Sequence, residues 1–426
     1  MEGTVNRIPG RRWRRALTAL GAAVFASSAV AACGSDDGGA VVNVYYPSEE
    51  NFEQVVAACN EAAGGRYQVV LNTLPREADG QREQMVRRLA AGDTEMDVLG
   101  LDVTWVAEFA EAGWIAEWTG QDKSEVENGT LPGPLATARW QDKLYAAPKN
   151  TNVQLLWYRD DITPTPPKSW SEMLSMAEGL RAQGKPSTVL LTGAQYEGLV
   201  VQFNTLVGGA GGKILSDDST RAVVDEGAVK ALRALKDLAT SPVSSASLSN
   251  AKEDPIRLDY QKGDSAFMLN WPFVYAAMKD ANPELFAHFK WAPYPAIDAD
   301  KTGTATIGGF NLAVSEYSTH KPAAFEAVRC LRNAENQKFS AINSGVPPTI
   351  ESVYSDPAMA EPYPMRDTIL AELKKPAPRP ITPAYQNVST LISTILSPPS
   401  AIDPQATAQR LREELQDALD SKGVLP

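Results

Sequence analysis

Strand and helix signals alternate along the first part of this chain, and this alternation constrains the fold more than any other feature. Short apolar runs at 41–46, 67–74 and 97–101 are typical of buried strands. The segments 51–63 and 79–89 between them carry apolar residues at helical spacing. This order predicts a largely parallel sheet covered by helices. Because 426 residues exceed one ordinary domain, we expect more than one such unit.

A second series of signals follows Ser169, which forms a capping box with Glu172 and predicts the start of a helix. Asp403, followed by a proline, predicts the start of the last helix. The segment 120–137 is rich in glycine, proline and polar residues and predicts a surface loop. Between these points we expect strands at 188–192, 265–270 and 304–314, and helices at 198–207 and 228–238.

The N-terminus has the pattern of an export signal. Residues 1–15 carry five arginines against one glutamate, and an uncharged stretch of mostly small and apolar residues follows up to Cys33. Such a pattern predicts a secretory signal peptide over 1–32. A cysteine directly after Val-Ala-Ala resembles the bacterial lipobox, which implies a lipid on Cys33 and anchoring to the outer face of the cell membrane. The alternative is a signal peptide with an incidental cysteine. Residues 33–40 predict a flexible tether.

Charge and composition exclude several functions. The net charge of −12 disfavours nucleic acid as a partner. Two histidines and three cysteines make a histidine or cysteine metal site improbable, and we expect no metal and no cofactor. The sequence also lacks a phosphate-binding loop and a nucleophile elbow, so we expect no ATPase or esterase activity.

Two cysteines remain in the body of the chain, Cys59 and Cys330, each in a helix-like context. A disulfide is permitted outside the cytoplasm, and we predict that these two pair. The alternative is two buried free thiols. If they pair, the chain leaves its first lobe and later returns to it.

Several phrases, in order and behind a lipobox, resemble the solute-binding proteins of carbohydrate ABC importers. The whole mature chain is similar to the trehalose-binding lipoproteins among them. The phrases are LDVTW at 101–105, EFAEAGW at 108–114, KLYAAP at 143–148, YEGLV at 196–200, NWPF at 270–273, IGGFN at 307–311 and RPITP at 379–383.

The resemblance implies an α/β clamp of two lobes, each a mainly parallel sheet flanked by helices. Hinge segments are then expected near 148–152, 295–308 and 346–352. Lobe 1 would comprise 41–148 and about 308–348, and lobe 2 would comprise 149–307 and about 349–426. The resemblance also implies a monomer that captures trehalose and delivers it to ABC permease subunits powered by a separate ATPase.

A site selective for a neutral disaccharide needs carboxylates and amides directed at hydroxyls, and aromatic rings against the sugar faces. Asp102 follows an apolar strand, at the end where open α/β sheets bind ligands. The resemblance makes Asp102, Asn152 and the fork-shaped donor Arg379 ligands. The alternatives are a helix-capping Asp, a turn Asn and a surface Arg.

Further candidates come from the same resemblance. Glu49 or Glu50 would accept from a hydroxyl, and which of them does so stays open. Trp271 is a stacking platform on this interpretation and a core residue on the alternative. Gly309 would let the backbone approach the sugar, or would mark a bulge or hinge. The remaining candidates are Gln81, Glu197 and Phe273.

Two other functions compete with trehalose capture. The first is binding of another α-glucoside such as maltose. The second is a secreted glycoside hydrolase, which would need two carboxylates flanking the scissile bond. A lipoprotein for phosphate esters would favour clustered basic residues, and only Arg379 lies in a suitable place. We expect a binding protein rather than an enzyme.

Overall fold

The structure, a computed structural model, describes residues 39–421. The predicted signal peptide, Cys33 and residues 33–38 of the predicted tether lie outside the described residues. The tether was predicted to extend to residue 40, but strand β1 already begins at Ala40. Strand β1 therefore begins one residue earlier than the sequence predicted.

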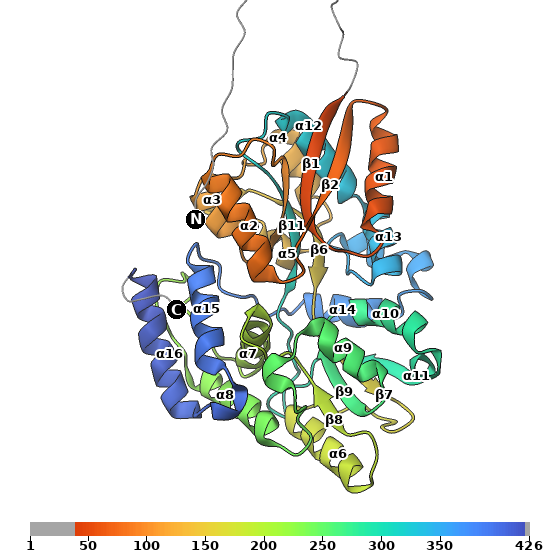
Figure 1. Cartoon of the computed structure of the whole chain (residues 1–426), viewed down its shortest axis with the longest axis vertical. Coiled ribbons are helices and arrows are strands. Elements are labelled where there is room, and N and C mark those ends of the chain that lie inside the picture. The colour runs from red at the N-terminus through yellow and green to blue at the C-terminus, as the bar shows by residue number, and fades with distance from the viewer. Residues whose placement is uncertain (1–38, 422–426) are drawn as a thin grey trace, which may run out of the picture. The chain divides into compact units, whose positions relative to one another are not determined.

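In the first sheet four of the five strands run in the same direction and only β11 is reversed, so the sheet is mainly parallel with one antiparallel strand (Figure 1). Strand β1 runs parallel to β2 and β3, whereas β11 runs antiparallel to β3 and β6. The chain leaves this sheet through β6 and returns through β11, so these two strands necessarily run in opposite directions. In sheet order the strands are β2 (Tyr67–Leu74), β1 (Ala40–Pro47), β3 (Val98–Asp102), β11 (Gly308–Val314) and β6 (Ala147–Asn152).

The second sheet likewise has one reversed strand, β7, which is antiparallel to both of its neighbours. The other neighbouring pair, β8 and β9, is parallel. Burial on both faces makes a strand apolar whatever its direction, so the apolar runs did not reveal the antiparallel pairs. The order is β10 (Phe289–Ala292), β7 (Leu155–Arg159), β9 (Ser265–Asn270) and β8 (Thr188–Leu190).

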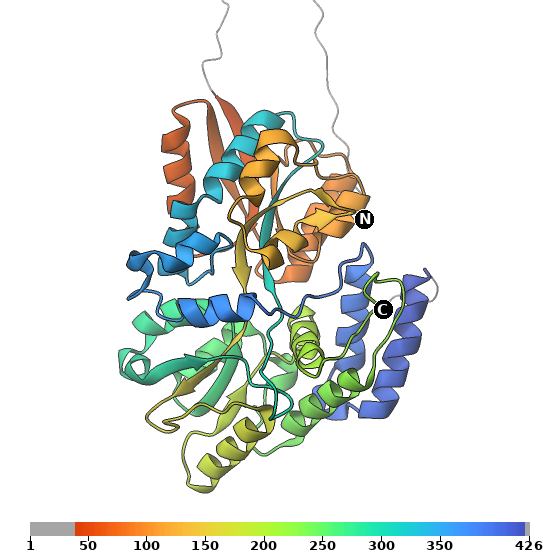
Figure 2. The ribbon, with the colours of Figure 1, turned by 180° about the vertical axis from the view of Figure 1, so that it is seen from behind.

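Helices pack around both sheets. Around the first sheet, α1 packs against β2 and α2 against β2 and β3, while in the second region α15 and α16 pack on α7 and α8 (Figures 1 and 2). The bounds are α1 (Phe52–Ala63), α2 (Ala78–Ala90), α3 (Val106–Glu111), α4 (Gly120–Glu127), α5 (Pro132–Thr137), α6 (Trp170–Ala182), α7 (Glu197–Gly209), α8 (Glu226–Thr240), α9 (Glu253–Gln261), α10 (Phe273–Ala281), α11 (Pro283–His288), α12 (Lys321–Leu331), α13 (Ala334–Ser344), α14 (Arg366–Leu373), α15 (Tyr385–Leu396) and α16 (Pro404–Leu419). The short strands β4 (Arg139–Trp140) and β5 (Lys143–Leu144) form a separate hairpin.

The helix starts that were predicted from capping residues agree well with the structure. The Ser169 hydroxyl accepts the Glu172 amide N–H at 3.2 Å, and the Asp403 carboxylate accepts the Ala406 N–H at 3.0 Å. Both predicted helix starts are therefore confirmed, because each cap satisfies a backbone donor that the helix itself leaves free.

The predicted loop at 120–137 was wrong, since α4 and α5 lie there. Only Val126 of α4 is buried, so this helix has no apolar stripe for a periodicity argument to detect. Helix α5 has proline at its first position, where the missing N–H costs nothing.

Two apolar clusters fill the interior. The first surrounds the first sheet and draws its buried residues from 42–147 and 312–331. The second surrounds the second sheet and, apart from Leu131, draws its buried residues from 153–307 and 341–418. The first apolar cluster is therefore built from two stretches of sequence, and the chain between them contributes much of the second apolar cluster.

A disulfide joins Cys59 of α1 to Cys330 of α12, as predicted. The two residues are 271 positions apart. The bond fixes the returning helix α12 against α1, at the edge of the first core.

Candidate functional site

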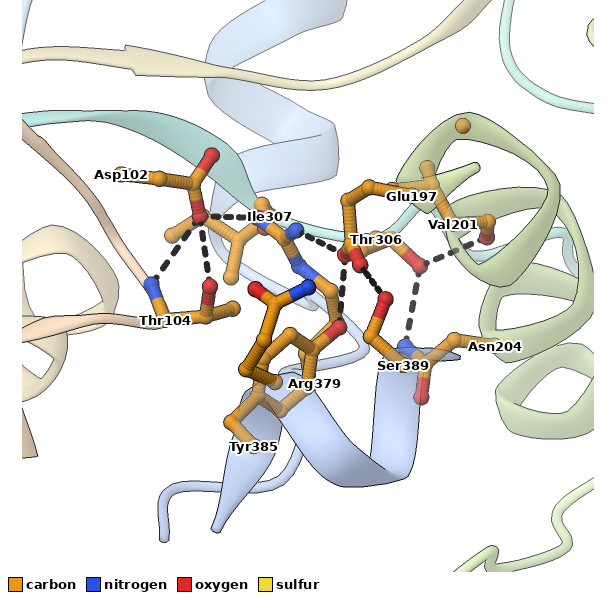
Figure 3. Close-up of polar contacts among 12 residues, drawn as sticks. Asp102, Thr104, Glu197, Val201, Asn204, Thr306, Ile307, Arg379, Tyr385 and Ser389 are labelled. Carbon is orange, nitrogen blue, oxygen red and sulfur yellow. Dashed lines mark hydrogen bonds and ion pairs between the residues drawn. The ribbon is translucent and has the colours of Figure 1, made fainter. Parts of the chain in front are cut away.

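Arg379 lies at the centre of a buried polar network (Figure 3). It is only 5% exposed, which excludes the surface arginine considered above. One guanidinium nitrogen, Nη2, lies 3.1 Å from Oδ1 of Asp102, and Nη1 lies 2.5 Å from Oε1 of Glu197. The structure thus brings together three predicted site residues that are far apart in sequence.

Each member of this network is positioned by the end of an element. Asp102 is the last residue of β3, and its Oδ1 also accepts the Thr104 N–H at 3.0 Å. Trp105 is the N-cap of α3, and this helix has no side-chain cap, so the alternative of a helix-capping Asp102 was wrong. Glu197 is the first residue of α7, where the helix dipole favours a carboxylate. From α15, the Tyr385 hydroxyl donates to Glu197 at 2.6 Å, and the Ser389 hydroxyl donates to its other oxygen.

Burial and charge shift the pKa values of this network. Burial raises the pKa of Glu197, the Arg379 guanidinium partly offsets this, and the negative Asp102 raises the pKa further. For Arg379, burial works against the charged form, but Asp102, Tyr385 and Glu197 outweigh it and raise the pKa. The network is therefore a cation held between two acids, one of which takes up a proton more readily than usual.

Trp271 lies beside Asn152 at the point where β6 and β11 pair. A Cβ placed on Gly308 would lie 3.0 Å from the Trp271 ring and 3.5 Å from Cβ of Asn152. Gly308 and Asn152 are partners in the strand register. Trp271 as a residue is only partly buried, so it is not a fully buried core residue.

Gly309 has a different explanation from the one that the resemblance implied. Its φ is +124°, and a Cβ there would lie 2.3 Å from the Asn150 carbonyl oxygen. The neighbouring strand β6 therefore already accounts for the glycine, and the ladder has an irregularity just beyond it. This agrees with the bulge alternative.

The two adjacent glutamates have different environments. The Glu49 carboxylate receives the buried Lys149 ammonium, the Tyr46 hydroxyl at 3.1 Å and the Ser340 hydroxyl at 2.9 Å. The oxygens of the Glu49 carboxylate thus already accept hydrogen bonds from these three protein donors. The Glu50 residue is exposed, and its backbone carbonyl is held by the Ser344 hydroxyl. Of the two, Glu50 is the one that keeps its side chain accessible.

Gln81 and Phe273 complete the predicted set. Gln81 is 2% exposed, and its amide nitrogen donates to the Arg76 carbonyl at 3.0 Å. Phe273 is partly buried against the second apolar cluster, next to Gly345. Phe273 therefore packs at the margin of the second apolar cluster.

Three predicted site residues carry a buried polar atom without a protein partner, as do Trp118, Gln154, Asn311 and Glu372 elsewhere among the described residues. On the predicted site residues these atoms are Gln81 Oε1, Asn152 Oδ1 and Arg379 Nε. A buried polar atom left unpaired costs about 1–3 kcal/mol. These acceptors and this donor can be satisfied by a hydroxyl-bearing ligand or by water.

A cavity of about 120 Å³ adjoins Arg379. It is lined mainly by apolar side chains and backbone from α5, the proline-rich segment 376–381 and Ile307, which belongs to the second apolar cluster. The lining residues are Val103, Thr104, Gly133, Ala136, Thr137, Ile307, Pro376, Pro378, Arg379, Pro380 and Ile381.

Sequence reasoning missed several polar residues beside the site. Tyr385 and Ser389 on α15 hold Glu197, and Tyr196 donates its hydroxyl proton to Glu253 at 2.6 Å. Of these residues, only Tyr196 could have been identified from the sequence, since it precedes Glu197 in the YEGLV phrase. Glu253 belongs to a charged helix start, a pattern that usually indicates an exposed surface.

The described residues contain one group with metal-ligand spacing: Asp160, Asp161 and His288, with ligand atoms within 4.8 Å of one another. It is remote in sequence from the network above, and cations already neutralise both carboxylates. Arg159 lies 2.7 Å from Asp161, and Lys290 lies 3.5 Å from Asp160. We therefore assign no metal to this group.

The comparisons with known proteins agree with this architecture. The model of the bacterial extracellular solute-binding protein family matches residues 46–338. The chain belongs to this family. A relative in Deinococcus radiodurans, described as a probable ABC transporter-binding protein, is 29% identical over 347 residues, which cover 76% of this chain and 80% of the relative.

Solved structures extend the likeness to nearly the whole described chain. The maltose-bound MalE3 of T. maritima is 28% identical, with a TM-score of 0.80, over 88% of this chain and 99% of its own. The GacH receptor of Streptomyces glaucescens, solved unliganded and with acarbose, is 22% identical, with a TM-score of 0.78, over 90% of this chain and 100% of its own. The two-lobed clamp is thereby confirmed, and the chain falls among binding proteins rather than enzymes.

No helix of residues 39–421 has the length and apolar character needed to cross a bilayer.

Proposed function

We propose that this chain is the extracytoplasmic sugar-binding component of an ABC importer, and that it captures a neutral disaccharide between its lobes. Membership of the solute-binding family and the 28% identity with a maltose-bound protein support the class of ligand. The lobes meet where Asp102 of the first sheet contacts Arg379, which lies beyond the second sheet in sequence.

The observation that carries the proposal is that three residues predicted to bind the sugar each have an unpaired, buried polar atom. Gln81 and Asn152 offer acceptor oxygens, and Arg379 offers an N–H donor. Sugar hydroxyls both donate and accept, so one disaccharide can satisfy all three. Trp271, which is only partly buried, supplies an apolar ring face of the kind that packs on a pyranose.

Trehalose is the ligand that we propose first, because the whole mature chain resembles the trehalose-binding lipoproteins. Maltose is the alternative, and MalE3, which was solved with maltose, supports it. The two sugars differ in where their hydroxyls point rather than in the residue types they need. We expect Glu50, rather than Glu49, to contact the sugar, since Glu49 is engaged by Lys149.

The proposed mechanism is capture by closure. We propose that residues 41–148 with about 308–348, and 149–307 with about 349–426, are the two lobes, and that sugar stabilises the closed form by contacting both. The closed form would dock on permease subunits, and a separate ATPase would drive transport. We further propose a monomer held at the membrane by a lipid on Cys33.

The test is a calorimetric titration of the mature protein with trehalose, maltose and glucose. We expect one disaccharide to bind, and Asp102→Asn to weaken it about tenfold to hundredfold, as expected for a lost charge-assisted hydrogen bond. Asp367→Asn is the matched control, because the Asp367 side chain is 86% exposed and pairs only loosely with Arg366.

Chromatography of the same mixtures distinguishes a binding protein from a hydrolase. We expect the disaccharide to be recovered intact after long incubation. Release of glucose would transfer the assignment to a glycoside hydrolase, and absence of binding to every sugar would refute the proposal.

A further inference from the structure

Charged side chains from the two proposed lobes meet outside the buried network. The Arg76 guanidinium lies 2.5 Å from the Asp254 carboxylate, and the Lys252 ammonium lies 3.4 Å from the Glu77 carboxylate. Residues 76–79 belong to proposed lobe 1, whereas residues 252–254 and Gln386 belong to proposed lobe 2, and we call this set the rim. Neither ion pair is used by the proposed function.

The order of the charges on the two sides of the rim is complementary. In lobe 1 the cation of Arg76 is followed directly by the anion of Glu77, and in lobe 2 the cation of Lys252 precedes the anion of Asp254. Each cation therefore faces an anion across the rim, and a shifted arrangement would place like charges opposite each other. The charges favour one way of bringing the rim together.

The lobe 2 side of the rim is held in position by its own lobe. The second oxygen of Asp254 accepts a hydrogen bond from Nε of Arg257, one turn along α9, at 3.2 Å. The Lys252 ammonium lies 5.3 Å from the centre of the Tyr196 ring, and the Tyr196 hydroxyl donates to Glu253 at 2.6 Å. Charges held in this way lose less side-chain freedom when the opposite side arrives.

The lobe 1 side of the rim is connected to the predicted sugar ligands. The Gln81 amide nitrogen donates to the Arg76 backbone carbonyl at 3.0 Å, and the Gln81 amide oxygen stays buried and unpaired. The amide nitrogen of Gln386 donates to Asp79 at 3.2 Å, and Gln386 lies on α15, the helix that also holds Glu197. Rim contact and the placement of two predicted ligands therefore involve the same helices.

We propose that the rim is an ion-pair latch, which stabilises the closed form of the clamp and keeps Gln81 in place for the sugar. The proposal rests on the proposed function for its consequence in binding. An exposed ion pair changes an equilibrium by only about twofold to fivefold. Two such pairs therefore favour closure without preventing reopening, which a protein that must release its ligand requires.

Salt distinguishes the rim from the buried network. The Arg76 side chain is 71% exposed, so dissolved ions screen its attraction to Asp254, whereas the buried pair of Arg379 with Asp102 is screened much less. The sugar itself carries no charge. We therefore expect the affinity for the preferred disaccharide to fall about twofold to tenfold between about 20 mM and about 500 mM NaCl.

Calorimetry with trehalose and maltose tests the latch through a double-mutant cycle. We expect Arg76→Gln and Asp254→Asn each to weaken binding about twofold to fivefold, and the double variant to bind no more weakly than the weaker single variant, because the pair is lost in all three. The matched control is Arg87→Gln, since Arg87 is an exposed residue of α2 that pairs with Glu83 of the same helix.

A measurement without sugar follows rim closure directly. Spin labels on Arg87→Cys of α2 and Lys262→Cys at the end of α9, in the mature protein with Cys33→Ala, report the separation of the two helices by pulsed electron paramagnetic resonance. We expect a population with the labels as close as in this structure. Adding Arg76→Glu, which places two anions opposite each other, should reduce that population at least about twofold.

The two readouts separate the latch from the proposed function. An affinity that is the same at both salt concentrations, losses that add in the double variant, or a close population that is absent or unaffected by Arg76→Glu would each overturn the latch. If no sugar binds the unchanged protein, the proposed function fails, and the sugar-free distance measurement still decides whether the rim holds the lobes together.

Discussion

Replacing Arg379 by methionine tests whether the buried network has the electrostatics described above. Methionine is similar in length and apolar, so it fills most of the space without the charge. The Arg379 side chain is 3% exposed, and those of Asp102 and Glu197 are 16% and 12% exposed. The substitution therefore leaves two poorly solvated carboxylates without their shared cation.

The expected loss is large at neutral and alkaline pH. Removing one partner of a buried ion pair costs about 3–5 kcal/mol, because the remaining charge stays uncompensated. Burial and Asp102 already raise the pKa of Glu197, and Arg379 is the largest opposing influence. Without Arg379 that pKa rises further. The Tyr385 and Ser389 hydroxyls remain and stabilise the carboxylate only in part.

The sign of the pH dependence follows from proton uptake. A folded pKa above the unfolded value means that the folded state holds the extra proton between the two. Over that interval the free energy of unfolding falls by about 1.4 kcal/mol per pH unit and then stays low. The stability deficit of Arg379→Met should therefore be small near pH 5 and largest near pH 8.

Urea unfolding of sugar-free protein at pH 5, 6, 7 and 8 measures this deficit. The double variant Arg379→Met with Glu197→Gln removes the second charge as well and should recover much of the loss. A deficit below about 1 kcal/mol at pH 8, or one that is equal at every pH, would refute the reasoning, since removal of a buried cation requires both a cost and a proton response.

Two further predictions concern covalent features. Replacing Cys59 and Cys330 by serine should lower the free energy of unfolding by about 2–5 kcal/mol, because the bond closes a long loop in the unfolded chain, and urea unfolding with and without reductant measures this. An unchanged midpoint under reducing conditions would contradict it. Cys33→Ala, in cells, should move the protein from membrane to soluble fractions if Cys33 is acylated; immunoblots of both fractions check this, and an unaltered distribution would argue against the lipid.

The sequence predicted features whose cause is local or that involve strong pairwise chemistry. The caps at Ser169 and Asp403 depend on side chains reaching backbone donors three residues away, so they could be identified from spacing alone. The disulfide was predicted because only two cysteines remain after the export signal. The strand–helix alternation indicated the α/β class, because apolar runs and helical periodicity can be recognised within short segments of sequence.

Features that depend on the path of the chain were harder to predict. Strand β11 runs against the rest of the first sheet because the chain returns to that sheet from the second, and no short window of sequence encodes that route. Helix α4 escaped detection because it buries a single residue. Within the site, Arg379, Asp102 and Glu197 were identified through a family resemblance, and the structure brings them together.

Glu253 shows why the rest could not be predicted. Its sequence context, Lys-Glu-Asp before a proline, is typical of an exposed helix start. The two neighbours do lie on the surface of the structure and pair across the rim, as that pattern suggests. The Glu253 side chain instead accepts a hydrogen bond from the hydroxyl of Tyr196, which lies 57 residues before it. Only the tertiary fold gives this carboxylate its partner.

A neutral ligand explains why the buried cations of this site are paired within the protein. An uncharged sugar cannot compensate a buried cation, so each buried cation must find an anionic partner in the protein before the ligand arrives. Arg379 meets this requirement between Asp102 and Glu197, and Lys149 meets it with Glu49. What remains unpaired is uncharged or a single N–H: the oxygens of Gln81 and Asn152 and the Nε of Arg379. Those atoms match the donors and acceptors of hydroxyl groups, and a sugar lacking the matching hydroxyl would leave one of them buried and unsatisfied, which is the physical basis for selectivity.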